Sequence, residues 1–158
     1  MAQSDWIKLT NIWKAIEDFP GDAGNEQTIF QEGQPLFGSR VQAGFPSPAD
    51  DYVEGRLDLN KHLVKHPAAT FFVRVAGESM INAGIHPNDI LVVDRSLEPT
   101  DKRVVIAVIN GELTVKRLRI TNGALHLMAE NPDYPPMEIT PSMEFEIWGV
   151  VVHVIHTL

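Results

Sequence analysis

One serine and one lysine in this sequence are placed where a nucleophile and its base would be expected. Ser79 follows the β-type run 70–75 across Gly77, so its hydroxyl is expected in a turn at the end of a strand. A serine is a weak nucleophile at its ordinary pKa and needs an adjacent base. The candidate base is Lys116, in the run 112–118. Most serines in such places are turn or helix-cap residues, so spacing alone leaves both interpretations open.

Two Asn-Gly pairs predict where the chain turns back on itself. An Asn-Gly pair between alternating apolar runs is the strongest short signal for a two-residue β-hairpin turn. The pairs at 110–111 and 122–123 therefore predict a meander of three antiparallel strands, over residues 103–109, 112–120 and 124–129. A strand before Ser79 and a long strand over 145–155, kinked at a glycine, are predicted as well. The expected fold class is mainly β: a single antiparallel β-rich domain with a mobile N-terminal arm.

The predicted register places Lys116 in the central strand of the meander. Counted back from the two turns, it faces Val105 on one side and Ala129 on the other. Desolvation in such a place disfavours the charged amine and lowers the pKa of a lysine. The alternative is a lysine whose stem lies along the sheet and whose amine reaches water.

The first third of the chain differs in character from the rest. Residues 5–19 carry apolar side chains at helical spacing, which predicts a short amphipathic helix ended by Pro20-Gly21. That helix would be marginal alone, so it would pack either on its own domain or on a partner chain. Residues 20–34 are polar and predict a mobile linker, and the prolines within 35–51 predict an extended arm. A DNA-binding domain would need two or three helices before the cleavage region, and we expect only one here, which argues against a repressor.

The amino-acid composition indicates which kind of partner the chain binds and which cellular compartment suits it. The chain has 158 residues, with 13 Lys and Arg against 21 Asp and Glu. It is therefore expected to be a poor direct binder of DNA phosphates, which are captured by clustered cations. The absence of cysteine excludes disulfides and thiol chemistry and suits the cytoplasm. The apolar runs are strand-sized and the N-terminus lacks signal-peptide character, so no membrane association is expected.

The histidines offer one familiar metal-ligand spacing. His62 and His66 would lie on one face of a helix, but a metal site needs further ligands on an ordered element, and Pro67 ends this helix at once. No phosphate loop or dinucleotide fingerprint is present, and no histidine stands in a recognisable triad context. We therefore expect neither a metal ion nor another cofactor.

Several separated motifs, read in order, resemble one family. They are Gly77-Glu78-Ser79-Met80, Gly84-Ile85, the run 88–94 and the run 112–118. Together they resemble the self-cleaving serine peptidases of the LexA and UmuD family. The stretch 41–54 is closest to the UmuD members, and the resemblance covers the chain from about Pro35 to His156.

The resemblance implies a Ser-Lys dyad. Ser79 would attack a peptide carbonyl and neutral Lys116 would take its proton. The main-chain N–H groups of Glu78 and Ser79 would form the oxyanion hole. The implied substrate is the chain itself, cut between Ala43 and Gly44, where small residues let the backbone approach the serine closely.

The same resemblance implies a protein of the bacterial SOS response. A RecA filament on single-stranded DNA would stimulate the cleavage, which would separate residues 1–43, with the helix, linker and arm, from residues 44–158, the β-rich peptidase and dimerisation domain. The product would form a homodimer and join a UmuC-type polymerase for translesion synthesis. One alternative is a cleavable LexA-type repressor, which the short acidic N-terminal region disfavours. Another is a non-catalytic interaction module of the same fold, which the intact dyad and Ala43-Gly44 pair disfavour.

Overall fold

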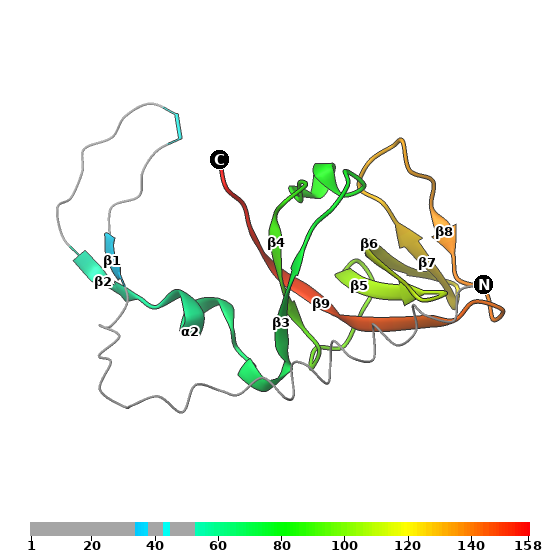
Figure 1. The fold of residues 1–158 in the computed structure, drawn as a ribbon, viewed down its shortest axis with the longest axis horizontal. Coiled ribbons are helices and arrows are strands. Elements are labelled where there is room, and N and C mark those ends of the chain that lie inside the picture. The colour runs from blue at the N-terminus through cyan, green and yellow to red at the C-terminus, as the bar shows by residue number, and fades with distance from the viewer. Residues whose placement is uncertain (1–33, 38–42, 45–52) are drawn as a thin grey trace, which may run out of the picture. The chain divides into compact units, whose positions relative to one another are not determined.

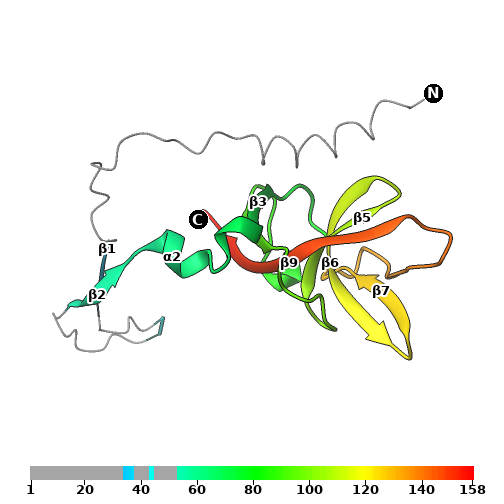
Figure 2. The same cartoon turned by 90° about the horizontal axis from the view of Figure 1, so that it is seen from below.

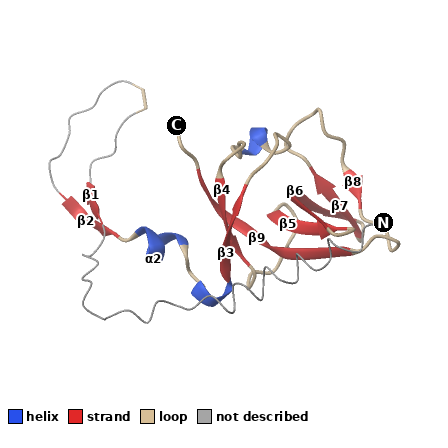
Figure 3. Ribbon diagram, in the orientation of Figure 1, coloured by secondary structure: helices blue, strands red, loops and turns tan. Residues whose placement is uncertain are grey.

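The computed structural model describes residues 34–37, 43–44 and 53–158. The chain divides into two compact units, and the larger one includes His66–Leu158. Strands dominate the described residues (Figure 3). The larger unit contains one seven-stranded sheet, ordered β3-β4-β9-β5-β6-β7-β8, and every neighbouring pair is antiparallel. The expected mainly-β antiparallel fold is confirmed, whereas the helix predicted at 5–19 and nearly all of the linker and arm lie outside the described residues.

β9 lies inside this sheet, between β4 and β5 (Figure 1). Seen from below, it curves strongly along its length (Figure 2). The strands are β3 Thr70–Arg74, β4 Ile90–Asp94, β5 Val104–Ile109, β6 Glu112–Thr121, β7 Ala124–Met128, β8 Met137–Glu138 and β9 Phe145–Ile155. Two 3-10 turns, η1 Pro67–Ala69 and η2 Ile81–Ala83, stand before and after β3.

The meander of β5, β6 and β7 forms as its two turns predict. Asn and Gly both have positive φ in each turn, 49° and 84° at 110–111 and 52° and 79° at 122–123, which matches the twist of a two-residue hairpin. Val105 faces Lys116 as predicted. The ladder between β6 and β7 ends at the pair Arg117–Met128. The predicted pair of Lys116 with Ala129 would be the next one, and it lies just outside this ladder.

β9 is irregular at the predicted glycine. Register shifts interrupt its ladders with both β5 and β4, and Gly149 lies next to the first shift. A Cβ at this position would stand 2.7 Å from Val93 Cγ1 and 3.1 Å from the carbonyl oxygen of Asp94. Glycine therefore lets β9 approach β4 closely where the sheet curves.

Apolar side chains are buried in two clusters that take alternate residues of β5. Ile106 belongs to the first cluster together with Met80, and its neighbours Val105 and Ala107 belong to the second. Met80 directly follows Ser79 and is only 1 % exposed. Burying such a side chain contributes about 1.5–3 kcal/mol, so the first cluster fixes the turn that carries the serine.

The smaller unit contains a two-stranded antiparallel hairpin and a short helix. β1 (Gln34–Phe37) pairs with β2 (Val53–Leu57), and α2 spans Leu59–Leu63. The Asp58 carboxylate caps this helix by accepting hydrogen bonds from two N–H groups of its first turn. The pairing of β1 with a second strand was not predicted. In the connection between them the structure describes Ala43 and Gly44, which are exposed.

Among the helices of the described segments, none has the length and apolar character that crossing a membrane requires.

Candidate active site

Ser79 and Lys116 lie side by side, although 37 positions separate them in the chain. Lys116 Nζ is 2.9 Å from Ser79 Oγ, which is hydrogen-bond range. The serine stands in the turn between β3 and η2, and the lysine stands in β6. The fold thus brings a hydroxyl and an amine together at the distance that an activated nucleophile and its base require.

A glycine directs the chain from β3 into the serine turn. Gly77 has a φ of +82°, a left-handed conformation that costs other residues strain. The next two residues carry the chain to the buried Met80 side chain, and the η2 turn follows. Strand, glycine, serine and short helical turn therefore occur in the predicted order.

The segment after β7 holds the same turn from the other side. Glu130 N–H donates to the carbonyl oxygen of Ser79 at 2.8 Å. Asn131 Nδ2 donates to the carbonyl oxygen of Glu78 at 2.9 Å, and Asn131 itself is only 8 % exposed. The peptide units before and after Ser79 are therefore both fixed by hydrogen bonds.

This anchoring also determines where the serine N–H points. A peptide unit is planar and trans, so a fixed Glu78 carbonyl fixes the Ser79 N–H in the opposite direction. Within the described segments, neither the N–H of Glu78 nor that of Ser79 donates a hydrogen bond. Donors that are oriented in advance are the groups that stabilise a developing oxyanion best.

Three oxygen atoms surround the amine of Lys116. Besides Ser79 Oγ, they are Thr114 Oγ1 at 3.0 Å and the carbonyl oxygen of Val115 at 3.1 Å. A neutral amine has two N–H groups and one lone pair. The Val115 carbonyl can only accept and the Thr114 hydroxyl is able to accept, so the lone pair is left to receive the hydroxyl proton of Ser79.

The surroundings of this amine favour its neutral form. Burial lowers the pKa of Lys116 below its ordinary value, because the charged amine loses contact with water. The side chain is partly buried in β6, and burial is the single cause of the shift. Without an opposing carboxylate among its described neighbours, the lysine is suited to accept a proton rather than to hold one.

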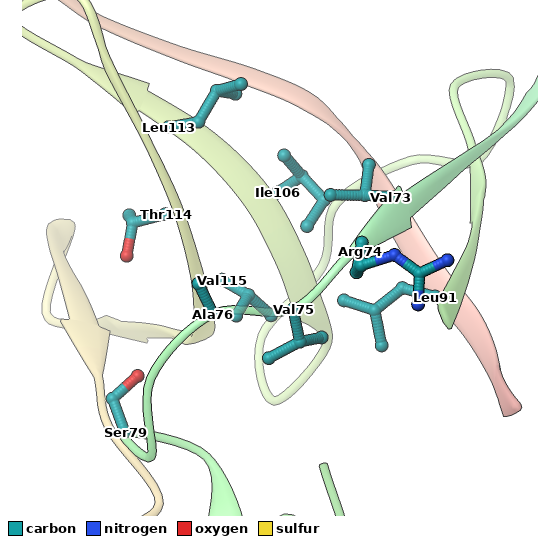
Figure 4. A pocket seen from close by; sticks show the side chains of 10 residues that line it. All are labelled: Val73, Arg74, Val75, Ala76, Ser79, Leu91, Ile106, Leu113, Thr114 and Val115. Atoms are coloured by element: carbon teal, nitrogen blue, oxygen red, sulfur yellow. The ribbon is translucent and has the colours of Figure 1, made fainter. Parts of the chain in front are cut away.

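Two clefts lie beside the pair. One, of about 250 Å³, contains Ser79, and in Figure 4 the apolar side chains of Val73, Leu91 and Ile106 lie across it from the serine. The other, of about 490 Å³, contains Lys116. Thr114 lines both. The serine and the lysine therefore each border recessed surface, and the two clefts adjoin at Thr114.

The structure brings together some of the expected site residues. Ser79 and Lys116 meet, with the N–H groups of Glu78 and Ser79 in the same turn. Ala43 and Gly44 belong to the other unit, in the connection between β1 and β2.

Two further residues contact the site and were missed in the sequence. Thr114 lies two positions before Lys116, so strand periodicity places both on one face of β6, and this signal would have found it. Asn131 is hydrogen-bonded to Glu78, 53 positions away in the sequence. No local sequence pattern predicts such a contact.

Comparison with known proteins now identifies the family. The Peptidase S24-like family matches residues 35–152. Protein ImpA of Escherichia coli is 50% identical over 138 residues, which cover 87% of this chain and 91% of that protein. Protein MucA of Escherichia coli is 48% identical over 120 residues, 75% of this chain and 82% of that protein. The LexA repressor of Dechloromonas aromatica is 38% identical over 155 residues, 98% of this chain and 76% of the repressor.

The fold and the family match define a serine peptidase domain of the self-cleaving kind. Within that class, the chain belongs to the Peptidase S24-like family as a UmuD-like member of the LexA and UmuD group. This membership confirms the expected class of function, an SOS mutagenesis protein with a self-cleaving peptidase domain.

Proposed function

We propose that Ser79 and Lys116 are the catalytic dyad of this peptidase. The observation that supports the proposal most directly is the 2.9 Å separation of Lys116 Nζ and Ser79 Oγ. Among the described residues, the amine has two acceptors besides the serine, and burial lowers the pKa of Lys116. A partly buried lysine with a lowered pKa beside a serine is one way in which proteins activate a hydroxyl.

The proposed reaction proceeds through an acyl-enzyme. Ser79 Oγ attacks the carbonyl carbon of the scissile bond while Lys116 accepts its proton. The N–H groups of Glu78 and Ser79 stabilise the oxyanion of the tetrahedral intermediate. The intermediate then collapses, and Lys116 gives the proton to the leaving amine. Neutral Lys116 next activates a water molecule, which hydrolyses the ester and frees Ser79.

We propose the bond between Ala43 and Gly44 as the substrate of this dyad. Both residues are exposed in the connection between β1 and β2. Neither presents a large side chain, so a backbone there can approach a serine closely. Cleavage would divide the chain into residues 1–43, which include the predicted helix and linker, and residues 44–158, which contain the whole seven-stranded sheet.

The position of the cut is directly measurable. Purified protein incubated alone at alkaline pH is expected to yield two fragments, and intact-mass measurement should place the new N-terminus at Gly44. The same Ala-Gly pair also occurs at 23–24, 76–77 and 83–84. A fragment that begins at Gly24, Gly77 or Gly84 would therefore contradict the assignment.

The proposed setting is DNA damage. A RecA filament on single-stranded DNA would stimulate cleavage, and residues 44–158 would act as an accessory subunit of a UmuC-type polymerase. The similarity to ImpA and MucA supports this setting. The formal net charge of −8 supports protein partners rather than direct DNA binding. Adding RecA, nucleotide and single-stranded DNA to the purified chain should raise the rate of fragment formation, and a DNA-binding assay tests the repressor alternative.

We also propose that the chain forms a homodimer, the commonest assembly of soluble oligomers. Phe72 is 56% exposed on the edge strand β3, and Ile155 is 41% exposed at the end of β9. Such residues are available for a second copy to cover. Sedimentation velocity at micromolar concentration should show dimers of the full chain and of residues 44–158. Monomers in both samples would rule the dimer out.

A further inference from the structure

A second cluster of titratable side chains lies outside the proposed dyad, at one end of the strands β4 and β9. His86 and Asp89 stand in the loop before β4, and His156 directly follows β9. Ile90 pairs with Ile155 in the ladder between these strands. The positions just beyond that pair, Asp89 and His156, are therefore neighbours across the sheet.

The side chains of this cluster converge on the carboxylate. Asp89 Oδ1 lies 2.6 Å from His156 Nδ1. Asp89 Oδ2 accepts a hydrogen bond from the main-chain N–H of His86 at 2.7 Å and lies 3.8 Å from the Nδ1 of the same residue. The two imidazole rings have centroids 4.9 Å apart. One ligand atom from each of the three residues falls within 4.8 Å of the others.

The carboxylate is fixed while the imidazoles can adjust. Asp89 is only 3% exposed, and its carbonyl oxygen accepts from Val75 N–H while Asn88 N–H donates back to Val75, both at 2.9 Å. The side chains of His86 and His156 are 46% and 42% exposed. Small ring rotations can therefore close the cluster without moving the sheet.

We propose that His86, Asp89 and His156 bind a divalent transition-metal ion, with Zn²⁺ as the representative. Two imidazole nitrogens and one carboxylate oxygen are ligands that zinc accepts, whereas calcium and magnesium prefer oxygen alone. Zinc–ligand distances of about 2.0–2.1 Å in a tetrahedron place ligand atoms about 3.3 Å apart. The ion would take the place of the proton between Asp89 and His156, and water would occupy the open position on the exposed side.

Binding at this place would join two separate parts of the chain. The ion would connect the residue after β9 to the loop before β4, and so hold the C-terminal residues against the sheet. Its role would be structural, and it does not depend on the proposed dyad. In the sequence, only His62 and His66 drew attention as possible metal ligands, because they are four positions apart. Among the described residues, His86, Asp89 and His156 form the one group of at least three possible metal ligands whose ligand atoms lie close together.

Calorimetric titration of the full-length protein with zinc chloride tests the proposal. We expect one ion to bind per chain. His86→Gln and His156→Gln should each weaken the affinity by about tenfold or more, since even residues behind the ligands often contribute that much. His62→Gln is the matched control and should bind zinc as the wild type does. The substitutions are made at exposed histidines rather than at buried Asp89, and circular dichroism should confirm that each variant folds.

The ligands themselves are observable by NMR of the histidine rings. Zinc should shift the ring-nitrogen resonances of His86 and His156 in the wild-type protein. Equal affinity in the wild type and the two glutamine variants would overturn the proposal, as would the absence of saturable binding. An equal loss in His62→Gln would assign the ion to the short helix instead. Zinc binding that leaves the His86 and His156 resonances unchanged would also overturn it.

Discussion

Ser79→Ala is expected to abolish self-cleavage at every pH, and Lys116→Arg to lower its rate by about 10²- to 10⁴-fold, the usual contribution of a general base. Without Oγ there is no atom to form the acyl-enzyme. Arginine keeps its proton throughout the accessible pH range, so it cannot accept the one that Ser79 must lose. Both effects are measured as initial rates of fragment formation on gels or by mass spectrometry.

The wild-type rate should itself depend on pH, in a direction set by Lys116. Burial lowers the pKa of this lysine from 10.5, so the neutral amine becomes abundant at a lower pH than it would in water. The rate should rise with pH as the proton is lost and should level off above the lysine pKa of the folded protein. Rates between about pH 6 and pH 11 bracket the ordinary lysine value.

Two matched control variants test whether the same substitutions lower the cleavage rate when they are made away from the proposed dyad. Lys61→Arg makes the same change at a side chain that is 87% exposed, and Ser142→Ala removes an exposed hydroxyl. Both should cleave at the wild-type rate. A cleavage rate that does not change with pH would show that Lys116 is not the base. A Lys116→Arg protein that cleaves at the wild-type rate would show the same.

Local sequence signals predicted much of the larger unit. The Asn-Gly turns determine a register in which Val105 faces Lys116, because both turn residues adopt positive φ and leave two residues between the strands. Gly77, three residues after the end of β3, leads into the serine turn for a similar reason. These predictions succeeded because each depends on a few neighbouring residues.

Contacts between distant segments were not predictable in this way. The pairing of β9 with both β4 and β5 depends on close approach at Gly149, whose neighbours come from another strand. Asn131 and Asp89 are buried polar residues, and their partners lie 53 and 67 positions away. Sequence spacing reveals neither contact. Only the folded structure shows that Asn131 supports the serine turn and that Asp89 lies in a cluster of possible ligands.

Asn131→Asp is expected to lower the plateau of the pH–rate profile by about tenfold to 10²-fold. The new side chain has the same shape, but an ionised carboxylate cannot donate to the Glu78 carbonyl and repels it. The peptide unit before Ser79 should then rotate, and its N–H should leave the direction of the oxyanion. Losing one oxyanion donor entirely costs about 10²–10³ in rate, and a misdirected donor should cost less. The midpoint should move to higher pH in this variant, because the added negative charge favours the protonated form of Lys116 without any direct contact.

The measurement compares rates on the alkaline plateau, where the introduced carboxylate is ionised, with the free energy of unfolding of the same proteins. Asn131→Ala should also lower the plateau, and leaving the buried Glu78 carbonyl without its donor should cost about 1–3 kcal/mol of stability. Asn122→Asp makes the same chemical change in an exposed turn and should cleave normally. A wild-type plateau in Asn131→Asp would show that this side chain does not orient the serine turn. A midpoint that shifts in Asn131→Ala, which adds no charge, would show that the Asn131 side chain acts through Lys116 instead.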